Sequence, residues 1–178
     1  MSFKNGIPCE PAGVKSTVRI WHENLEALVL SDRVPLSKLA PESHIHGGLR
    51  LEIAGRLVPS LGYWGPDDVC FDEWLTELSR VAIAMQNSGG RHIYDEGEQG
   101  QPAFVFQRDG DRAFFSIITS EISDGEGRPD WQNIEFSPTD FLDAYDIFRS
   151  LFFAEVRAAS PTSADVWLKR FAQQQPAT

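Results

Sequence analysis

The pattern of hydrophobic and polar residues is clearest over residues 49–58, where it alternates with a period of two. One face carries Leu49, Leu51 and Ile53, and the other carries Arg50 and Glu52. This alternation predicts a half-buried β-strand that folds back at Gly55. Residues 16–21 and 27–30 are shorter β-prone runs, although residues 23–30 fit a short helix equally well.

Beyond the turn-rich residues 59–68 the hydrophobic period changes to about 3.6, which predicts a helix. Its buried stripe consists of Trp74, Leu75, Leu78, Val81, Ala82 and Met85. We expect Asp72 to cap the start of this helix, and the Ser-Gly-Gly sequence at residues 88–90 to end it.

Three strand-like runs follow, at residues 91–95, 102–106 and 112–119. Between the last two, Asp109 and Gly110 are flanked by apolar residues, which is a strong signal for a β-hairpin. The sheet is therefore expected to be at least partly antiparallel, and residues 133–136 predict one further short strand.

Two helices are expected in the C-terminal part of the chain. Ser137, Pro138 and Asp140 form a helix start in which Ser137 is the N-cap. The buried face of that helix is Phe141, Tyr145, Phe148, Phe152 and Val156. A second Ser-Pro pair at residues 160–161 predicts a short helix with Val166, Trp167 and Phe171 turned inward.

The order of these elements does not alternate strand and helix as a parallel α/β protein would. It predicts an α+β fold with a mainly antiparallel sheet, two longer helices and a short C-terminal helix packed on one face. Residues 1–16 are rich in Gly and Pro and predict an irregular N-terminal arm. Residues 17–178 have a length that suits a single domain.

The charge of the chain is concentrated in one segment. The formal net charge is −10, and residues 67–146 alone hold 18 acidic residues against 5 arginines and no lysine, a balance of −13. Such a surface repels nucleic acid and anionic membranes and attracts basic partners. A surface that serves solubility alone is the alternative interpretation.

The chain contains no run of apolar residues long enough to span a membrane, and its N-terminus has no apolar signal segment. Its two cysteines, Cys9 and Cys70, are too few for a disulfide framework. We therefore expect a cytoplasmic protein.

Few residues predict chemistry. His44 and His46 form a His-x-His pair that points two imidazoles to one side of a strand, but a metal site requires a third ligand. The candidates for that ligand are His22, His92, Glu42 and Glu52, and none stands at a recognised spacing. The alternative is that His44 and His46 are solvated loop residues with Ile45 turned inward.

Cys70 precedes a helix and is a candidate nucleophile only if a histidine reaches it and the helix lowers its pKa. Its apolar neighbours favour a packed thiol instead. The glycine-containing acidic loop at residues 120–131 lacks the ligand spacing of a calcium-binding EF-hand. No glycine fingerprint for a nucleotide is present, so no cofactor is expected.

Residues 49–156 resemble small cytosolic immunity proteins of bacterial polymorphic-toxin and secreted-effector systems. The resemblance lies in the order of an alternating strand, the segment VCFDEWLTELSRVAIAM, the segment HIYDEG, the strand pair PAFVFQRDGDRAFFSI and the closing FSPTDFLDAYDIFRSLFFAEV. It implies a non-enzymatic inhibitor that binds a cognate toxin and blocks its active site. An acidic surface suits a basic toxin such as a nuclease.

The expected partner-binding surface therefore combines acidic residues of three connections with exposed aromatic anchors. Its residues are Tyr94, Asp95, Glu96, Glu98, Asp109, Asp111, Glu121, Asp124, Glu126, Asp130 and Trp131. Trp131 packing under its own loop, and Tyr94 pairing across the sheet, are the alternatives for the two anchors. The alternative functions are a metal-assisted hydrolase that uses His44 and His46 with nearby carboxylates, and a structural subunit of a homo-oligomer.

Overall fold

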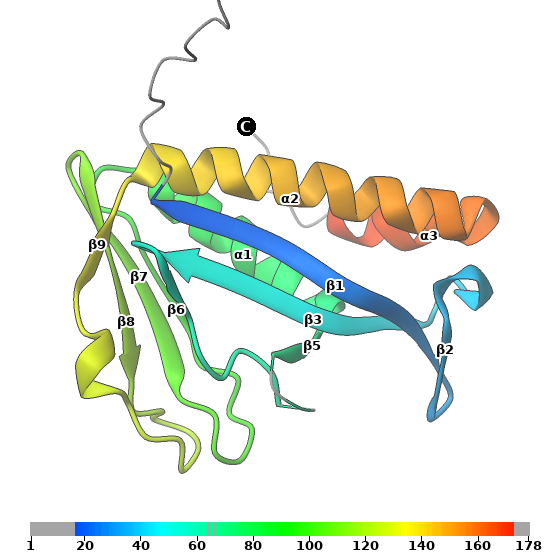
Figure 1. The fold of residues 1–178 in the computed structure, drawn as a ribbon, viewed down its shortest axis with the longest axis horizontal. Helices are drawn as coiled ribbons and strands as arrows, with labels where there is room; N and C mark the ends of the chain where they lie inside the picture. The colour runs from blue at the N-terminus through cyan, green and yellow to red at the C-terminus, as the bar shows by residue number, and fades with distance from the viewer. Residues whose placement is uncertain (1–16, 64, 66, 173–178) are drawn as a thin grey trace, which may run out of the picture.

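The computed structural model describes residues 17–63, 65 and 67–172, so the predicted N-terminal arm lies outside the described residues. Figure 1 shows the arrangement of two antiparallel sheets and three α-helices, which confirms the α+β fold. The strands divide between two sheets, a detail that the sequence pattern did not predict. The elements are β1 (Val18–Val29), β2 (Asp32–Pro35), η1 (Leu36–Lys38), β3 (His44–Ile53), β4 (Arg56–Leu57), β5 (Asp68–Cys70), α1 (Phe71–Gln86), β6 (Arg91–Tyr94), β7 (Ala103–Asp109), β8 (Arg112–Ile118), η2 (Pro129–Trp131), β9 (Ile134–Phe136), α2 (Pro138–Ala159) and α3 (Pro161–Ala172).

The first sheet is built around β1 and β3, in the order β2-β1-β3-β4 with β5 also paired to β3. The ambiguous residues 23–30 continue β1 as a strand, with a bulge between Glu23 and Glu26. A Cβ at Gly47 would lie 2.8 Å from the Glu23 carbonyl oxygen, so the two backbones approach closely there only because residue 47 is glycine. The chain turns back after β3 at Gly55, as the alternation predicted.

The second sheet has the order β6-β7-β8-β9, and all its pairs are antiparallel. Asp109 pairs with Arg112 across the turn that contains Gly110, whose φ is 61°. The predicted Asp-Gly hairpin is therefore confirmed. Phe104, Phe106 and Phe115 from its two strands are buried in the core.

Helix α1 begins one residue earlier than its predicted cap. Cys70 occupies the N-cap position without a side-chain hydrogen bond, so the prediction that Asp72 caps the helix is wrong. Asp72 lies in the first turn, where its Oδ2 accepts a hydrogen bond from the Ile45 backbone N–H at 3.2 Å. It therefore ties the helix to β3. The helix ends at Gln86, just before the predicted Ser-Gly-Gly segment.

Helix α2 begins as its sequence predicted. The Ser137 side chain accepts a hydrogen bond from the Asp140 backbone N–H at 3.2 Å, and all five residues of the predicted face are buried.

The buried stripe of α3 differs from the prediction at one position. Trp167 is buried, and its Nε1 donates to the Ser43 carbonyl oxygen at 2.9 Å, while Phe171 is half-buried. Val166, however, is 49% exposed. Ala164 and Leu168 lie inside instead, because they share one helical face with Trp167.

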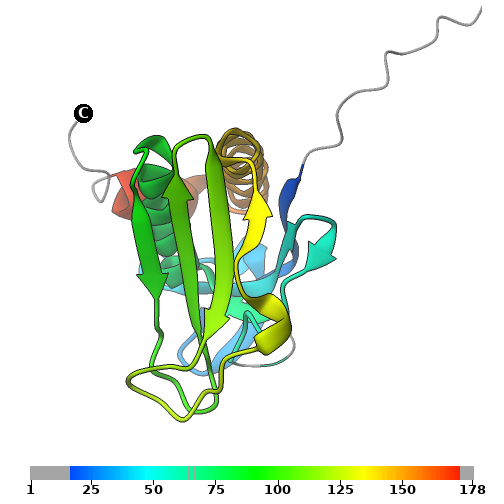
Figure 2. The ribbon, with the colours of Figure 1, turned by 90° about the vertical axis from the view of Figure 1, so that its left-hand side faces the viewer.

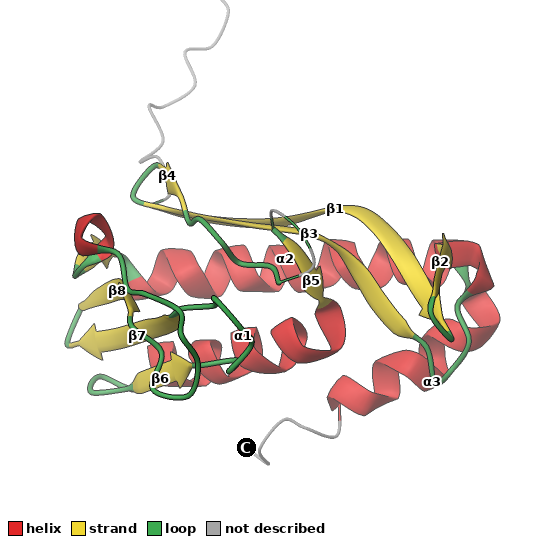
Figure 3. Ribbon diagram, turned by 90° about the horizontal axis from the view of Figure 1, so that it is seen from below, coloured by secondary structure: helices red, strands yellow, loops and turns green. Residues whose placement is uncertain are grey.

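The three helices form a layer that contacts both sheets (Figure 3). Helix α2 packs along β1, whereas α1 packs against β3, β6 and β7 and also against α2. In Figure 2 the second sheet faces the viewer, and α1 lies behind it. Helix α1 therefore stands where the two sheets meet. None of the described helices has the length and apolar character that a membrane span requires.

Candidate functional site

A surface pocket of about 420 Å³ lies between the N-terminal half of α1 and the loop that follows β6. We call it the acidic pocket. Its lining residues are Asp72, Glu73, Thr76, Glu77, Arg80, Tyr94, Asp95, Glu96 and Glu98. Six of them carry a carboxyl group and only one, Arg80, is a permanent cation. Negative charge therefore predominates in the acidic pocket.

Glu77 is a buried residue of α1, and its carboxylate contacts two basic side chains. Its Oε1 accepts from Arg80 at 2.6 Å, and its Oε2 lies 2.7 Å from the His92 Nε2 of β6. These contacts hold α1 against the second sheet. Arg80, the single cation of the pocket, is therefore already engaged by a carboxylate.

Asp95 has a structural role at the edge of the acidic pocket. Its two oxygens accept hydrogen bonds from the Ser120 hydroxyl at 2.7 Å and from the Glu121 backbone N–H at 2.9 Å. Asp124 reaches back in the same manner, accepting from the Gly100 N–H at 2.7 Å. The loops 95–102 and 119–133 are thereby joined at one end of the second sheet.

Glu73, Asp95, Glu96 and Glu98 are the carboxyl groups of the pocket that form no ion pair with a basic side chain in the described part of the chain. Of these, Asp95 is held by its two hydrogen bonds. Burial, followed by the charges of Glu73 and Glu98, raises the pKa of Glu96 to about 7. The pocket therefore holds uncompensated negative charge, which a bound cation would relieve.

Tyr94 lies in the wall of the acidic pocket and is only 8% exposed. Its hydroxyl oxygen is buried, and the Glu96 carboxyl group lies beside it. Burial, followed by the charge of Glu96, raises the pKa of this hydroxyl, so it stays neutral. A neutral hydroxyl beside a carboxyl group is a hydrogen-bond donor to it, so Tyr94 positions Glu96 in the pocket wall.

The expectation that Tyr94 and Trp131 are exposed anchors is wrong. Tyr94 pairs with Phe104 across the sheet and packs edge-on against Trp74, with ring centres 4.9 Å apart. Trp131 is 4% exposed under its own loop, with the Arg56 guanidinium 4.2 Å above its ring. The alternatives are therefore confirmed: Tyr94 pairs across the sheet, and Trp131 packs under its own loop.

Asp109 and Asp111 do not belong to the acidic pocket. Their hairpin is at the end of the second sheet opposite to loops 95–102 and 119–133, at the top of the sheet in Figure 2. It is fixed to the C-terminal end of α1, because the Arg108 backbone N–H donates to the Gly90 carbonyl at 2.8 Å and its guanidinium donates to the Met85 carbonyl. The predicted acidic surface is therefore divided between two ends.

The remaining predicted residues belong to loop 119–133 but do not line the pocket. Glu121, Asp124, Glu126 and Asp130 are exposed. Asp130 is paired with Arg56 at 3.2 Å, which holds η2 against β4. Of the eleven predicted residues, four line the acidic pocket: Tyr94, Asp95, Glu96 and Glu98.

Helix α1 supplies the residues that sequence reasoning missed: Asp72, Glu73 and Glu77. Their signal was the spacing of four residues between Glu73 and Glu77, which places two acids on one side of a helix. The sequence pattern predicted only a helix cap at Asp72.

The prediction that His44 and His46 are loop residues is wrong, because β3 begins at His44, and the prediction that they are solvated is correct for His44 alone. Ile45 is buried as expected, but His46 is also buried, at 4% exposure. Burial, followed by the charge of Arg33, lowers the pKa of His46, which keeps it neutral. His44 is exposed at the strand end, beside Cys70 and Asp72.

The four residues considered as a third metal ligand do not join this pair. The described residues contain one group of metal-ligating atoms, and it consists of His44, Cys70 and Asp72. His22 contacts Glu155 at 2.8 Å, His92 contacts Glu77, and Glu52 pairs with Arg19 at 3.6 Å. Glu42 belongs to no such group either.

Cys70 is reached by a histidine, since its Sγ lies 3.8 Å from the His44 Nδ1. Burial, followed by the charge of Asp72, nevertheless raises the pKa of its thiol to about 12. The thiol is therefore protonated at neutral pH, which opposes a role as a free nucleophile.

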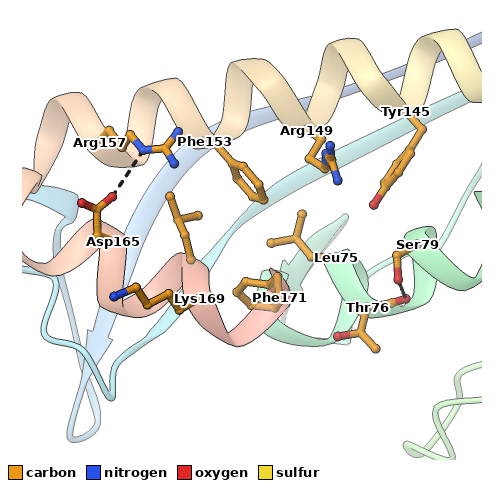
Figure 4. A pocket seen from close by; sticks show the side chains of 11 residues that line it. Leu75, Thr76, Ser79, Tyr145, Arg149, Phe153, Arg157, Asp165, Lys169 and Phe171 are labelled. Atoms are coloured by element: carbon orange, nitrogen blue, oxygen red, sulfur yellow. Dashed lines mark hydrogen bonds and ion pairs between the residues drawn. The ribbon is translucent and has the colours of Figure 1, made fainter. Parts of the chain in front are cut away.

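A second cleft, of about 380 Å³, lies between the three helices (Figure 4). We call it the helical cleft. Leu75 and Phe171 form part of its apolar wall, and the side chains of Arg149, Arg157 and Lys169 reach toward it. Two of these cations already interact with other side chains. Arg157 forms an ion pair with Asp165 at 3.6 Å, and the Arg149 guanidinium lies about 6 Å from the ring centres of Tyr145 and Phe153.

Comparisons of the chain with protein-family models, with curated proteins and with solved structures each returned no match.

Proposed function

We propose that this chain is a non-enzymatic binding protein, and that its acidic pocket receives a lysine or arginine side chain of a protein partner. The observation that carries the proposal is one pocket that brings together four carboxyl groups without a counterion, those of Glu73, Asp95, Glu96 and Glu98. The charge of a cationic side chain offsets the repulsion among them, and its N–H groups donate to the carboxylate oxygens.

The groups that line the acidic pocket suit a protein side chain better than a free metal ion. The carboxyl groups come from both helix α1 and the loop after β6, and the Thr76 hydroxyl lies among them. A long side chain with several N–H donors matches this mixture of acceptors. A hard cation would instead require a tight shell of six or more oxygens.

An apolar contact lies beside the charged groups. Ile122, which is 67% exposed, packs against Gly97 between Glu96 and Glu98. Gly97 has a φ of 75°, and a Cβ there would stand 2.8 Å from the Ile122 Cδ1, so the loop backbone itself forms the seat of this side chain. Ile122 replaces Trp131 and Tyr94 as our candidate for the apolar anchor of the interface.

The partner that suits this surface best is a bacterial toxin with a basic active site, which the chain would block as an immunity protein. The balance of −13 over residues 67–146 supports long-range attraction of such a partner. The order of elements that resembles immunity proteins supports the same class.

The test is binding to the product of the adjacent gene, with the double variant Glu73→Gln/Glu96→Gln. We expect the wild-type complex to weaken as salt concentration rises. The double variant should raise Kd by about thirtyfold or more, which corresponds to about 2 kcal/mol for the loss of a buried charge pair. Co-expression should also protect cells from the partner only when the acidic pocket is intact.

Asp109→Asn/Asp111→Asn is the matched control, because it removes the same charge at the opposite end of the second sheet. Its Kd should stay within about threefold of wild type at moderate salt, since exposed charges contribute little. If no complex forms, if salt has no effect on it, or if the two double variants weaken binding equally, the proposal is wrong.

A further inference from the structure

A second group of polar side chains lies at the junction between β3 and α1. His44 is the first residue of β3, Cys70 is the last residue of β5 and the N-cap of α1, and Asp72 is in the first turn of that helix. Figure 3 shows β5 running into α1 beside β3. The pairing of β5 with β3 brings these three residues together although 28 positions separate His44 from Asp72.

The three side chains present one nitrogen, one sulfur and one oxygen within 4.8 Å of one another. The His44 Nδ1 and Asp72 Oδ2 are 3.2 Å apart, and the Cys70 Sγ lies 3.8 Å from each of them. In a tetrahedral zinc site, bonds of about 2.0–2.3 Å place neighbouring ligand atoms about 3.3–3.6 Å apart. The triangle of ligand atoms therefore differs from that of a zinc site by a few tenths of an ångström.

We propose that His44, Cys70 and Asp72 bind a Zn²⁺ ion through these three atoms. The Cys70 proton passes to solvent when the ion binds, so that one thiolate and one carboxylate balance the charge of the metal. A mixed sulfur, nitrogen and oxygen set with one thiolate selects Zn²⁺ over Mg²⁺ and Ca²⁺, which prefer oxygen ligands alone.

The surroundings prepare two of the ligands. The Arg170 Nη1 lies 3.3 Å from the Asp72 Oδ1, which fixes the carboxylate and leaves Oδ2 directed at the other two ligands. Cys70 is the N-cap of α1, so its sulfur lies at the positive end of the helix dipole, which favours a thiolate ligand. A divalent ion supplies the positive charge that this thiol otherwise lacks.

The exposure of His44 leaves the fourth coordination position of the ion on the solvent side. Three protein ligands with one open position are the arrangement in which zinc exchanges water for another ligand. The ion would also link β3 to α1. This link lies at the edge of the acidic pocket, because Asp72 is both a zinc ligand and a lining residue of that pocket.

The test uses Co²⁺ as a probe for the zinc position in the full-length, chelator-treated protein. We expect one Co²⁺ per chain, a near-ultraviolet thiolate-to-cobalt absorption band, and displacement of Co²⁺ by Zn²⁺. His44→Gln should raise Kd at least about tenfold, and Cys70→Ser should remove the absorption band. Because Asp72 also binds the Ile45 N–H, the two variants at residues 44 and 70 are the decisive ones.

Cys9→Ser is the matched control, since it removes the other thiol of the chain and should leave the band unchanged. A band that persists in Cys70→Ser, an affinity indifferent to His44→Gln, or binding of less than one ion per chain would overturn the proposal. The measurement requires no protein partner, so its outcome is independent of the proposed function.

Discussion

Replacement of Glu96 by glutamine should stabilise the free protein at high pH. The groups that face this carboxyl are Glu73 from α1, Tyr94 from β6 and Glu98 from its own loop. Burial and the two neighbouring charges raise its pKa from 4.5 to about 7. Glutamine resembles the protonated form at every pH, so the variant escapes the cost of ionising this group inside the pocket.

The raised pKa determines the direction of the effect with pH. Folding favours the protonated form of Glu96, and this stabilisation is fully present below pH 4.5 and is lost as pH rises toward 7. The difference between the two pKa values corresponds to about 3 kcal/mol at most. Glu96 is only half-buried, and solvent screening reduces the expected effect to about 1–2 kcal/mol.

Urea unfolding of the wild type and of Glu96→Gln at pH 4.5 and pH 8.5 measures this effect. The two proteins should have similar free energies of unfolding at the lower pH, and the variant should be the more stable at the higher pH. Asp111→Asn, at the far hairpin, is the control and should show no such change with pH. A variant that is less stable at pH 8.5, or a difference that does not vary with pH, would refute the account of the acidic pocket. The same substitution should weaken partner binding, so stability and function would move in opposite directions.

Three further predictions concern the fold and are measured as free energies of unfolding in urea. Ser137→Ala removes the cap of α2 and should cost about 1 kcal/mol, whereas an unchanged stability would show that the cap is dispensable. Gly47→Ala should cost on the order of 1–3 kcal/mol, because its Cβ would meet the Glu23 carbonyl oxygen at 2.8 Å; wild-type stability would mean that β1 yields easily at its bulge. Trp167→Phe should cost about 2 kcal/mol through lost volume and a lost hydrogen bond, while Val166→Ser on the exposed side of α3 should change stability by less than about 0.5 kcal/mol; equal effects would contradict the orientation of α3.

The features that the sequence predicted correctly depend on residues close together in the chain. The cap of α2 requires only Ser137 and the backbone three residues later, and the hairpin requires only Asp109 and Gly110 between two apolar runs. Such interactions leave a local pattern because the residue types and their spacing suffice to form them.

The errors arose where distant segments meet. The burial of Trp131 depends on Arg56 of β4, and the burial of Tyr94 depends on Trp74 of α1. The charge count grouped Asp109 with Asp95, but the sheet places the two at opposite ends. Periodicity gives the side of a strand on which a residue lies, yet it does not tell which other segment covers that side.

The hydrogen bonds from Arg108 fasten the hairpin end of the second sheet to the Met85 carbonyl of α1 and to the Gly90 carbonyl in the segment that follows this helix. The opposite end consists of loops 95–102 and 119–133, which are bonded to each other through Asp95 and Asp124 and to β4 through the Asp130–Arg56 pair. Substitutions at exposed positions of these loops, such as Glu98, Glu121 and Glu126, should therefore leave the core contacts of the sheet intact, whereas a change at the buried Trp131 should disturb them. The exposed positions of this end can therefore vary in sequence without loss of the fold, while its buried residues and the hairpin end preserve it.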